Sequence, residues 1–147
     1  MDFHLTQEQK LYAENARRMV DRDIEPILRA HDPDRPLPKA ELLRIFALFA
    51  REGLTAPRLP VEAAGSGMKM LNYGLVLEQL PPAIANSLIA HEATITRIYL
   101  GSDSEQRERF LPDAIAGRKI NLGIFPHAHL AAADKIVGAF NVDVRKI

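Results

Sequence analysis

Two histidines separated by a single residue, His127 and His129, have the spacing that most directly suggests a metal site. Residues two apart in a strand lie on the same face, so both imidazoles could bind one ion. A metal site needs a third ligand, and Asp134 is the only nearby candidate. Two surface histidines in a loop produce the same pattern far more often, so we predict no metal site.

A second pair, His91 and Glu92, lies midway along an apolar stretch with helical spacing. An imidazole next to a carboxylate could work as an acid–base pair or line a pocket. Adjacent residues of a helix point about 100° apart, however, so these two side chains do not form one site unaided. We expect His91 to make a hydrogen bond within the core instead.

The remaining reactive residue types do not combine into a catalytic site. The chain has no cysteine, which excludes thiol nucleophiles, thiolate metal sites and disulfides. The motif Gly65–Gly67 is too short for a phosphate loop and does not follow a strand, so a structural turn explains it better. No nucleophile is paired with a base, and we assign no catalytic residue.

Composition excludes several classes of protein. Among 147 residues, 19 Lys and Arg balance 19 Asp and Glu, so no net charge attracts nucleic acid or an anionic membrane. No stretch approaches the roughly 20 apolar residues that a membrane helix needs, and Met1–Leu5 does not begin a signal peptide. We expect a cytoplasmic protein that binds neither nucleic acid nor membrane.

Apolar residues that recur every three or four positions predict five helices. The first begins at a capping box, Thr6–Gln9, runs for about 22 residues, and is kinked or ended by Pro26. The others are expected at residues 38–52, 71–80, 83–100 and 102–117, the last opened by a capping box at Ser102–Glu105 and closed by Gly117. The fourth helix has few polar positions, which predicts burial nearly all round.

After Lys119 the pattern changes from helical to alternating. Residues 120–125 and 140–144 read as strands, and the segment between them is a loop or a helical turn. The sequence therefore predicts a mainly α fold, an up-down bundle of about five helices followed by one or two β-strands. We divide it into a helical domain, residues 1–118, and a β-like tail, residues 119–147.

Several segments, in this order, resemble the acyl-CoA dehydrogenase family. They are Met1–Phe3, Leu5–Gln9, Arg22–Pro26, Glu52–Pro57, Ala64–Met68, Leu75–Leu80, Leu100–Arg107, Phe110–Pro112 and Ala116–Gly117. Glu52–Pro57 resembles the family's Gly-Leu-Thr-x-Pro turn, and Ala64–Met68 resembles its Gly-Gly-x-Gly loop. The ordered set, with family-like spacing from residue 1 to about 125, is what makes the resemblance specific.

The resemblance implies the N-terminal helical domain of an FAD-dependent oxidoreductase that dehydrogenates acyl-CoA thioesters between the α and β carbons. Family members place FAD between a middle β-domain and a C-terminal bundle, and a glutamate removes the α proton. The fourth helix borders the acyl tail in the family, which makes Leu88 and His91 candidates for the substrate pocket. Acyl-CoA would be the substrate of the full-length protein.

The chain departs from the family pattern where flavin contacts are expected. Pro126–Ala128 stands in place of the family's Thr-Glu-Pro, and Leu130–Ala133 in place of Ala-Gly-Ser-Asp. Proline has no amide hydrogen and alanine has no side-chain donor, so no residue is assigned as a flavin ligand. The catalytic glutamate also lies beyond Ile147 in the family. We therefore expect no FAD binding and no activity from this chain alone.

Two functions remain open. The chain is the N-terminal domain of an acyl-CoA dehydrogenase-like protein, or it is a stand-alone, non-catalytic helical interaction module or degenerate partner subunit. The altered Pro126–Ala128 motif favours the second reading. In either case we expect a homo-oligomer or an assembly with a related dehydrogenase chain, because the two strands would have few neighbours.

Overall fold

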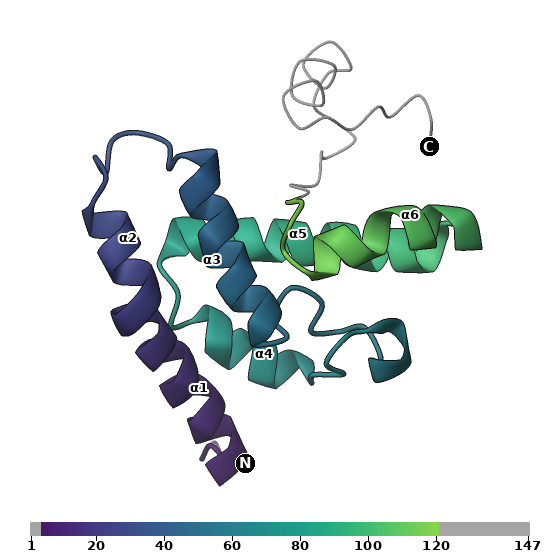
Figure 1. Cartoon of the computed structure of the whole chain (residues 1–147). Coiled ribbons are helices and arrows are strands. Elements are labelled where there is room, and N and C mark those ends of the chain that lie inside the picture. Colours follow the sequence, from purple (N-terminus) through teal and green to yellow (C-terminus); the bar gives the residue numbers. More distant parts are fainter. Residues whose placement is uncertain (1–3, 121–147) are drawn as a thin grey trace.

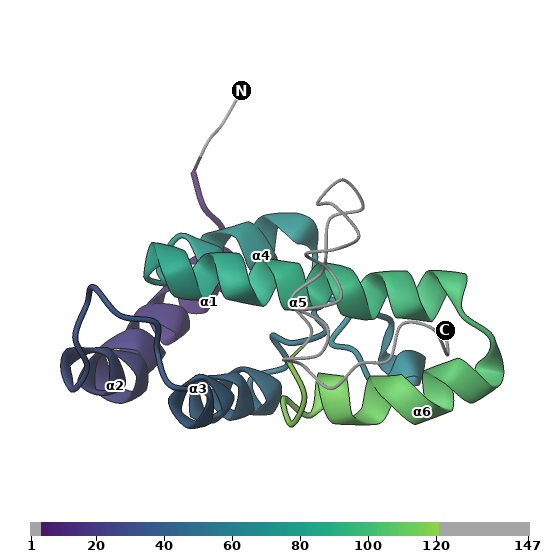
Figure 2. The ribbon, with the colours of Figure 1, turned by 90° about the horizontal axis from the view of Figure 1, so that it is seen from above.

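The computed structural model describes residues 4–120, and these residues form a layered helical domain (Figure 1). Helices α3, Lys39–Arg51, and α6, Ser104–Ile115, lie in one layer. Helices α4, Met70–Leu77, and α5, Pro82–Gly101, lie in the layer behind it, as the view from above shows (Figure 2). The first helical segment flanks one end of both layers.

The first helical segment consists of α1, Gln7–Met19, a π-helical turn, Val20–Ile24, and α2, Glu25–Arg29. Thr6 and Gln9 form the predicted capping box. Pro26 does not end the helix, because it lies in the first turn of α2, where its missing N–H is tolerated. The irregularity is the π-helical turn that precedes it, which widens the backbone before the proline ring.

The boundaries of the other helices are close to those predicted, with two corrections. Helix α4 ends at Leu77 rather than Leu80, because Gln79 and Leu80 bond to carbonyls three residues back and Pro81 follows. The cap of α6 is Asp103 with Gln106, one residue later than predicted, because the Asp103 carboxylate is the group that accepts from the N3 amide.

Helix α5 is buried along one stripe and not all round. The buried residues of this stripe are Ile84, Leu88, His91, Glu92 and Ile95. Ile89 and Leu100 are 43% and 75% exposed, so the opposite side lies at the surface of the described domain. The prediction that α5 is buried nearly all round was wrong for this part of the chain. A folded protein leaves many apolar side chains at its surface, so an apolar sequence does not by itself require burial.

Two apolar clusters hold the domain together. The larger cluster lies among α1, α2, α3, α4 and the first half of α5, and its fully buried members include Ile24, Ile45, Phe46, Phe49 and Leu88. The smaller cluster consists of Ala56, Leu59, Ile95, Leu111 and Ala114, between the loop after α3, the second half of α5, and α6. The loop that follows α3 therefore packs mainly on the smaller cluster.

The predicted strands, residues 120–125 and 140–144, lie outside the described residues, apart from Ile120, which is irregular. The domain division at residue 118 likewise stays a prediction. Within residues 4–120 every regular element is helical. None of the helices in that range has the length and apolar character required to cross a membrane.

Candidate functional site

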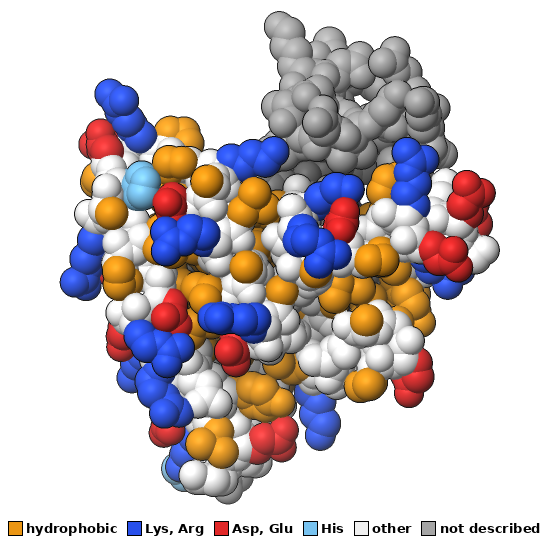
Figure 3. Space-filling view, in the orientation of Figure 1, with side chains coloured by type: hydrophobic (Ala, Val, Ile, Leu, Met, Phe, Trp, Pro, Cys, Tyr) orange, Lys and Arg blue, Asp and Glu red, His pale blue; other side chains and the backbone are white. Residues whose placement is uncertain are grey.

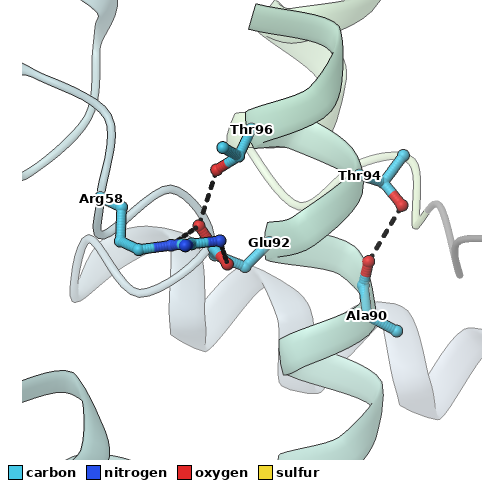
Figure 4. A network of polar contacts seen from close by, with 5 residues as sticks. All are labelled: Arg58, Ala90, Glu92, Thr94 and Thr96. Atoms are coloured by element: carbon cyan, nitrogen blue, oxygen red, sulfur yellow. Dashed lines mark hydrogen bonds and ion pairs between the residues drawn. The ribbon is translucent and has the colours of Figure 1, made fainter. Parts of the chain in front are cut away.

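An ion pair with a buried carboxylate joins the loop after α3 to the middle of α5 (Figure 4). Arg58 donates to both carboxylate oxygens of Glu92, from Nε to Oε1 at 2.7 Å and from Nη2 to Oε2 at 2.6 Å. Thr96 adds a third bond, from Oγ1 to Glu92 Oε1 at 2.8 Å. The Glu92 side chain is 3% exposed and that of Arg58 is 38% exposed, so the carboxylate is in the interior and the guanidinium reaches it from the surface.

The local backbone explains why Arg58 reaches α5. Gly53, with φ of +68°, ends α3 and turns the chain into the loop, where a residue with a Cβ would be strained. Further along, a Cβ at Gly65 would lie 2.1 Å from the carbonyl oxygen of Leu59. The turn at Gly53 and the close passage at Gly65 lie on either side of Arg58 and fold the loop back on itself.

The pair is electrostatically coupled to a buried phenol. Hydrogen bonding to Glu92 raises the pKa of Arg58, so the guanidinium stays charged at neutral pH. Tyr73 on α4 is 2% exposed, and burial, followed by the negative charge of Glu92, raises the pKa of its hydroxyl. Among the described residues the Tyr73 hydroxyl has no hydrogen-bond partner. A phenol in this state stays protonated and cannot serve as a base near neutral pH.

His91 and Glu92 bond to different elements, His91 to α6 and Glu92 to the loop, so they do not form one site. The Nε2 atom of His91 lies 3.0 Å from the carbonyl oxygen of Ala114 on α6. The rings of His91 and Phe46 meet edge to face, with 4.9 Å between their centroids. Burial lowers the pKa of His91 to about 4, so the imidazole is neutral at pH 7. A carbonyl only accepts, so Nε2 carries the proton. The hydrogen bond within the core that we expected for His91 is confirmed.

Leu88 and His91, the predicted pocket residues, are both fully buried and lie in the same helix. Neither lines the two hollows described below. Their contact with an acyl tail therefore stays a prediction. His127, His129 and Asp134 lie outside the described residues, and within residues 4–120 no three His, Cys, Asp or Glu side chains are grouped to hold a metal ion.

Two surface hollows occur in the described domain. The larger, of about 670 Å³, is lined mainly by apolar residues of the C-terminal part of α3, the short turn Val61–Ala63, α5 and α6. Figure 3 shows hydrophobic side chains gathered on this face, between α6 and the turn. The smaller, of about 370 Å³, lies between the first helical segment and α3, where Arg22 and Arg44 are each paired with an acid.

Three interior polar groups of the described domain bond to other parts of it. The buried hydroxyl of Thr55 donates to the carbonyl oxygen of Ile115, and His91 and Glu92 are engaged as described above. These interior polar groups bind other parts of the domain, so their chemistry here is to hold the helices and the loop together.

The sequence interpretation missed Arg58, Thr55 and Tyr73. One signal was available: Glu92 is a charged residue on the apolar stripe of a helix, and a buried carboxylate requires a cationic or hydrogen-bonding partner. Which cation supplies it could not be read from spacing, because Arg58 precedes Glu92 by 34 residues. Helix faces were predictable, but the partner of each buried polar group was not.

Comparison with known proteins is consistent with this architecture. The family model for the N-terminal domain of acyl-CoA dehydrogenases matches residues 6–118. The chain is 32% identical over 111 residues to cyclohex-1-ene-1-carbonyl-CoA dehydrogenase of Syntrophus aciditrophicus, covering 74% of this chain and 26% of that protein. It is 37% identical over 111 residues to the enzyme of the same name from Geobacter metallireducens, covering 74% and 28%.

The solved structure of butyryl-CoA dehydrogenase from Megasphaera elsdenii has the same fold over 82% of this chain and 32% of that one, with a TM-score of 0.65 and 24% identity. The chain thus spans about a quarter to a third of the proteins that it resembles. The family match and the helical fold together establish that the chain belongs to the acyl-CoA dehydrogenase family and carries its N-terminal domain.

Proposed function

We propose that this chain supplies the N-terminal helical domain of an FAD-dependent acyl-CoA dehydrogenase-like protein, which as a whole dehydrogenates an acyl-CoA thioester. The observation that carries the proposal is the match of the family's N-terminal domain to residues 6–118, the range over which the described helices form. The domain's role in this proposal is to support and position the other segments.

In this proposal the chain alone neither retains FAD nor turns over substrate. The interior side chains of Thr55, Glu92 and His91 are engaged in bonds among the loop, α5 and α6, and we assign none of them the role of the family's glutamate. The flavin, which accepts the hydride when bound, and the base are proposed to belong to segments other than this chain. Catalysis then depends on how those segments are held against this domain.

The proposed substrate is a CoA thioester with a compact acyl group. The two relatives above are named for a six-membered ring carboxylate, cyclohex-1-ene-1-carbonyl-CoA. Leu88 and His91 are proposed to support the pocket for that group from the interior of the domain, because both side chains are fully buried.

The test is a spectrum of the purified chain after incubation with FAD and removal of the excess, followed by an assay with acyl-CoA thioesters and an artificial electron acceptor. We expect no visible flavin band and no turnover. A retained flavin band would contradict the assignment of the flavin site to other segments. Turnover of any thioester would contradict the assignment of the base to them.

A second candidate function is a degenerate partner that assembles with a related dehydrogenase chain or with itself. The replacement of the family's Thr-Glu-Pro by Pro126–Ala128 favours it. Sedimentation over a wide concentration range, alone and mixed with a related full-length dehydrogenase, measures this association. A monomer that stays monomeric in both experiments would exclude the partner function.

A further inference from the structure

The C-terminal end of α6 is capped by side chains from other parts of the domain. The last four carbonyls of a helix have no partner within it. Here the Ala114 carbonyl accepts from the amide of Gly117 at 3.0 Å and from His91 Nε2 at 3.0 Å. The Ile115 carbonyl accepts from Thr55 Oγ1 at 2.6 Å. Two consecutive carbonyls are thus satisfied by α5 and by the loop after α3.

The turn that follows is held against α3 as well. Gly117 has φ of +67°, and a Cβ added to it would lie 2.5 Å from the carbonyl oxygen of Phe46. Arg118 and Lys119 pair with the Asp113 carboxylate at 2.9 and 2.8 Å. Their amides also donate to the backbone carbonyl of Asp113, at 2.9 and 3.1 Å. The turn therefore has partners on α3 and α6 in addition to the cap.

Ile120, the last described residue, packs against the larger apolar cluster. The segment 116–120 thus contacts α3 and α6 directly. The two carbonyls just before it, of Ala114 and Ile115, are bonded to α5 and to the loop. Helix ends commonly fray over one or two residues, and chain segments that leave a domain are poorly ordered unless they are tied down. A turn that only ended α6 would not need bonds from α5 and from the loop as well.

We propose that His91 and Thr55 are positioning residues that make residues 116–120 a rigid joint, which sets the direction in which the polypeptide leaves the helical domain. The proposal rests on the proposed function, because a fixed exit direction matters only where a further domain must be oriented. The two side chains act through the carbonyls of Ala114 and Ile115 and touch no reacting atom.

The test is amide hydrogen exchange, followed by NMR, on the 147-residue chain. His91→Phe keeps a ring against Phe46 but removes the donor, and Thr55→Val keeps the branched shape but removes the hydroxyl. Thr55→Ser and His91→Gln retain a donor and serve as conservative rescues. Ile84→Val, in the larger cluster, is the control for general loss of stability.

The amides of Gly117, Arg118 and Lys119 are expected to exchange about tenfold faster in His91→Phe and Thr55→Val, relative to the amides of α1 in the same variant. The rescue variants and the control are expected to leave that ratio within about twofold of the parent. An unchanged ratio in both donor-deleted variants would overturn the proposal, because the joint would then follow global stability alone. Thr55→Val keeps this test possible if His91→Phe does not fold.

This measurement needs neither flavin nor substrate. The exchange measurement can therefore contradict the rigid joint while the proposed function holds. A retained flavin band would contradict the proposed function without changing the exchange ratio. In a full-length protein that binds FAD, Thr55→Val is expected to lower flavin retention and Thr55→Ser to restore it.

Discussion

The two apolar clusters of the domain are held in different ways. The larger cluster is built from aliphatic and aromatic side chains of α1 to α5, and Phe46 and Phe49 meet there edge to face at 5.6 Å. The smaller cluster has five buried members, two of them alanine, and is enclosed by the bonds of Arg58, Thr55 and His91. A cluster with little apolar area to bury gains its definite geometry from directed polar contacts.

The largest effect is expected from the larger cluster. Phe46→Ala should lower the free energy of unfolding by about 4 kcal/mol, because a fully buried ring is removed and the cavity collapses only in part. Urea denaturation followed by circular dichroism measures it. Phe46→Leu, which retains most of the volume, is the matched control and should cost much less. Equal losses for both variants would mean that packing volume does not stabilise this cluster.

The ion pair between Arg58 and Glu92 is the next strongest determinant. Arg58→Met should destabilise the domain by about 3 kcal/mol, because it leaves the Glu92 carboxylate buried without its cation. The double variant Arg58→Met, Glu92→Met should recover much of that loss, since no buried charge remains. A double-mutant cycle by urea denaturation checks this. If the double variant were no more stable than Arg58→Met, the cost would lie in packing and not in charge.

The smallest effect is a dependence of stability on pH through His91. Burial lowers the pKa of His91 from 6.5 to about 4, so the unfolded chain binds a proton more readily than the folded one. The stabilisation is therefore complete above pH 6.5 and is lost as pH falls toward 4. Between pH 7 and pH 5 the loss should be about 2 kcal/mol.

His91→Gln is the control for this pH dependence, because an amide can donate to the Ala114 carbonyl but does not titrate. Urea denaturation at pH 7, 6 and 5 should show a steeper decline for the parent chain than for this variant. Parallel curves would show that carboxylates, and not the buried imidazole, govern the acid sensitivity of the domain.

The elements of the fold could be predicted because their signals are local. The apolar spacing of residues 38–52 and the capping box of Thr6 and Gln9 depend on neighbours three or four positions away. Where a boundary was wrong, the cause was a local competition: Pro81 shortened α4, and the carboxylate of Asp103, not the hydroxyl of Ser102, capped α6.

The candidate sites were less predictable. His91 was expected to bond within the core and does so, but its partner Ala114 is 23 residues away. Arg58 was not singled out, although Glu92 signalled that a partner was needed. Three predictions remain untested by the described residues. They are the placement of an acyl group near Leu88 and His91, the strands, and the interpretation of His127 and His129.

By itself the sequence determined the helices and the family, because helix periodicity, capping and ordered motifs are properties of consecutive residues. Only the tertiary structure decided which buried polar groups pair, because Arg58 with Glu92, Thr55 with Ile115 and His91 with Ala114 join residues 34, 60 and 23 positions apart. Such bonds form only when packing of the two helices and the loop has brought the donor and acceptor atoms to within about 3 Å. The spacing of residues along the chain does not encode that distance.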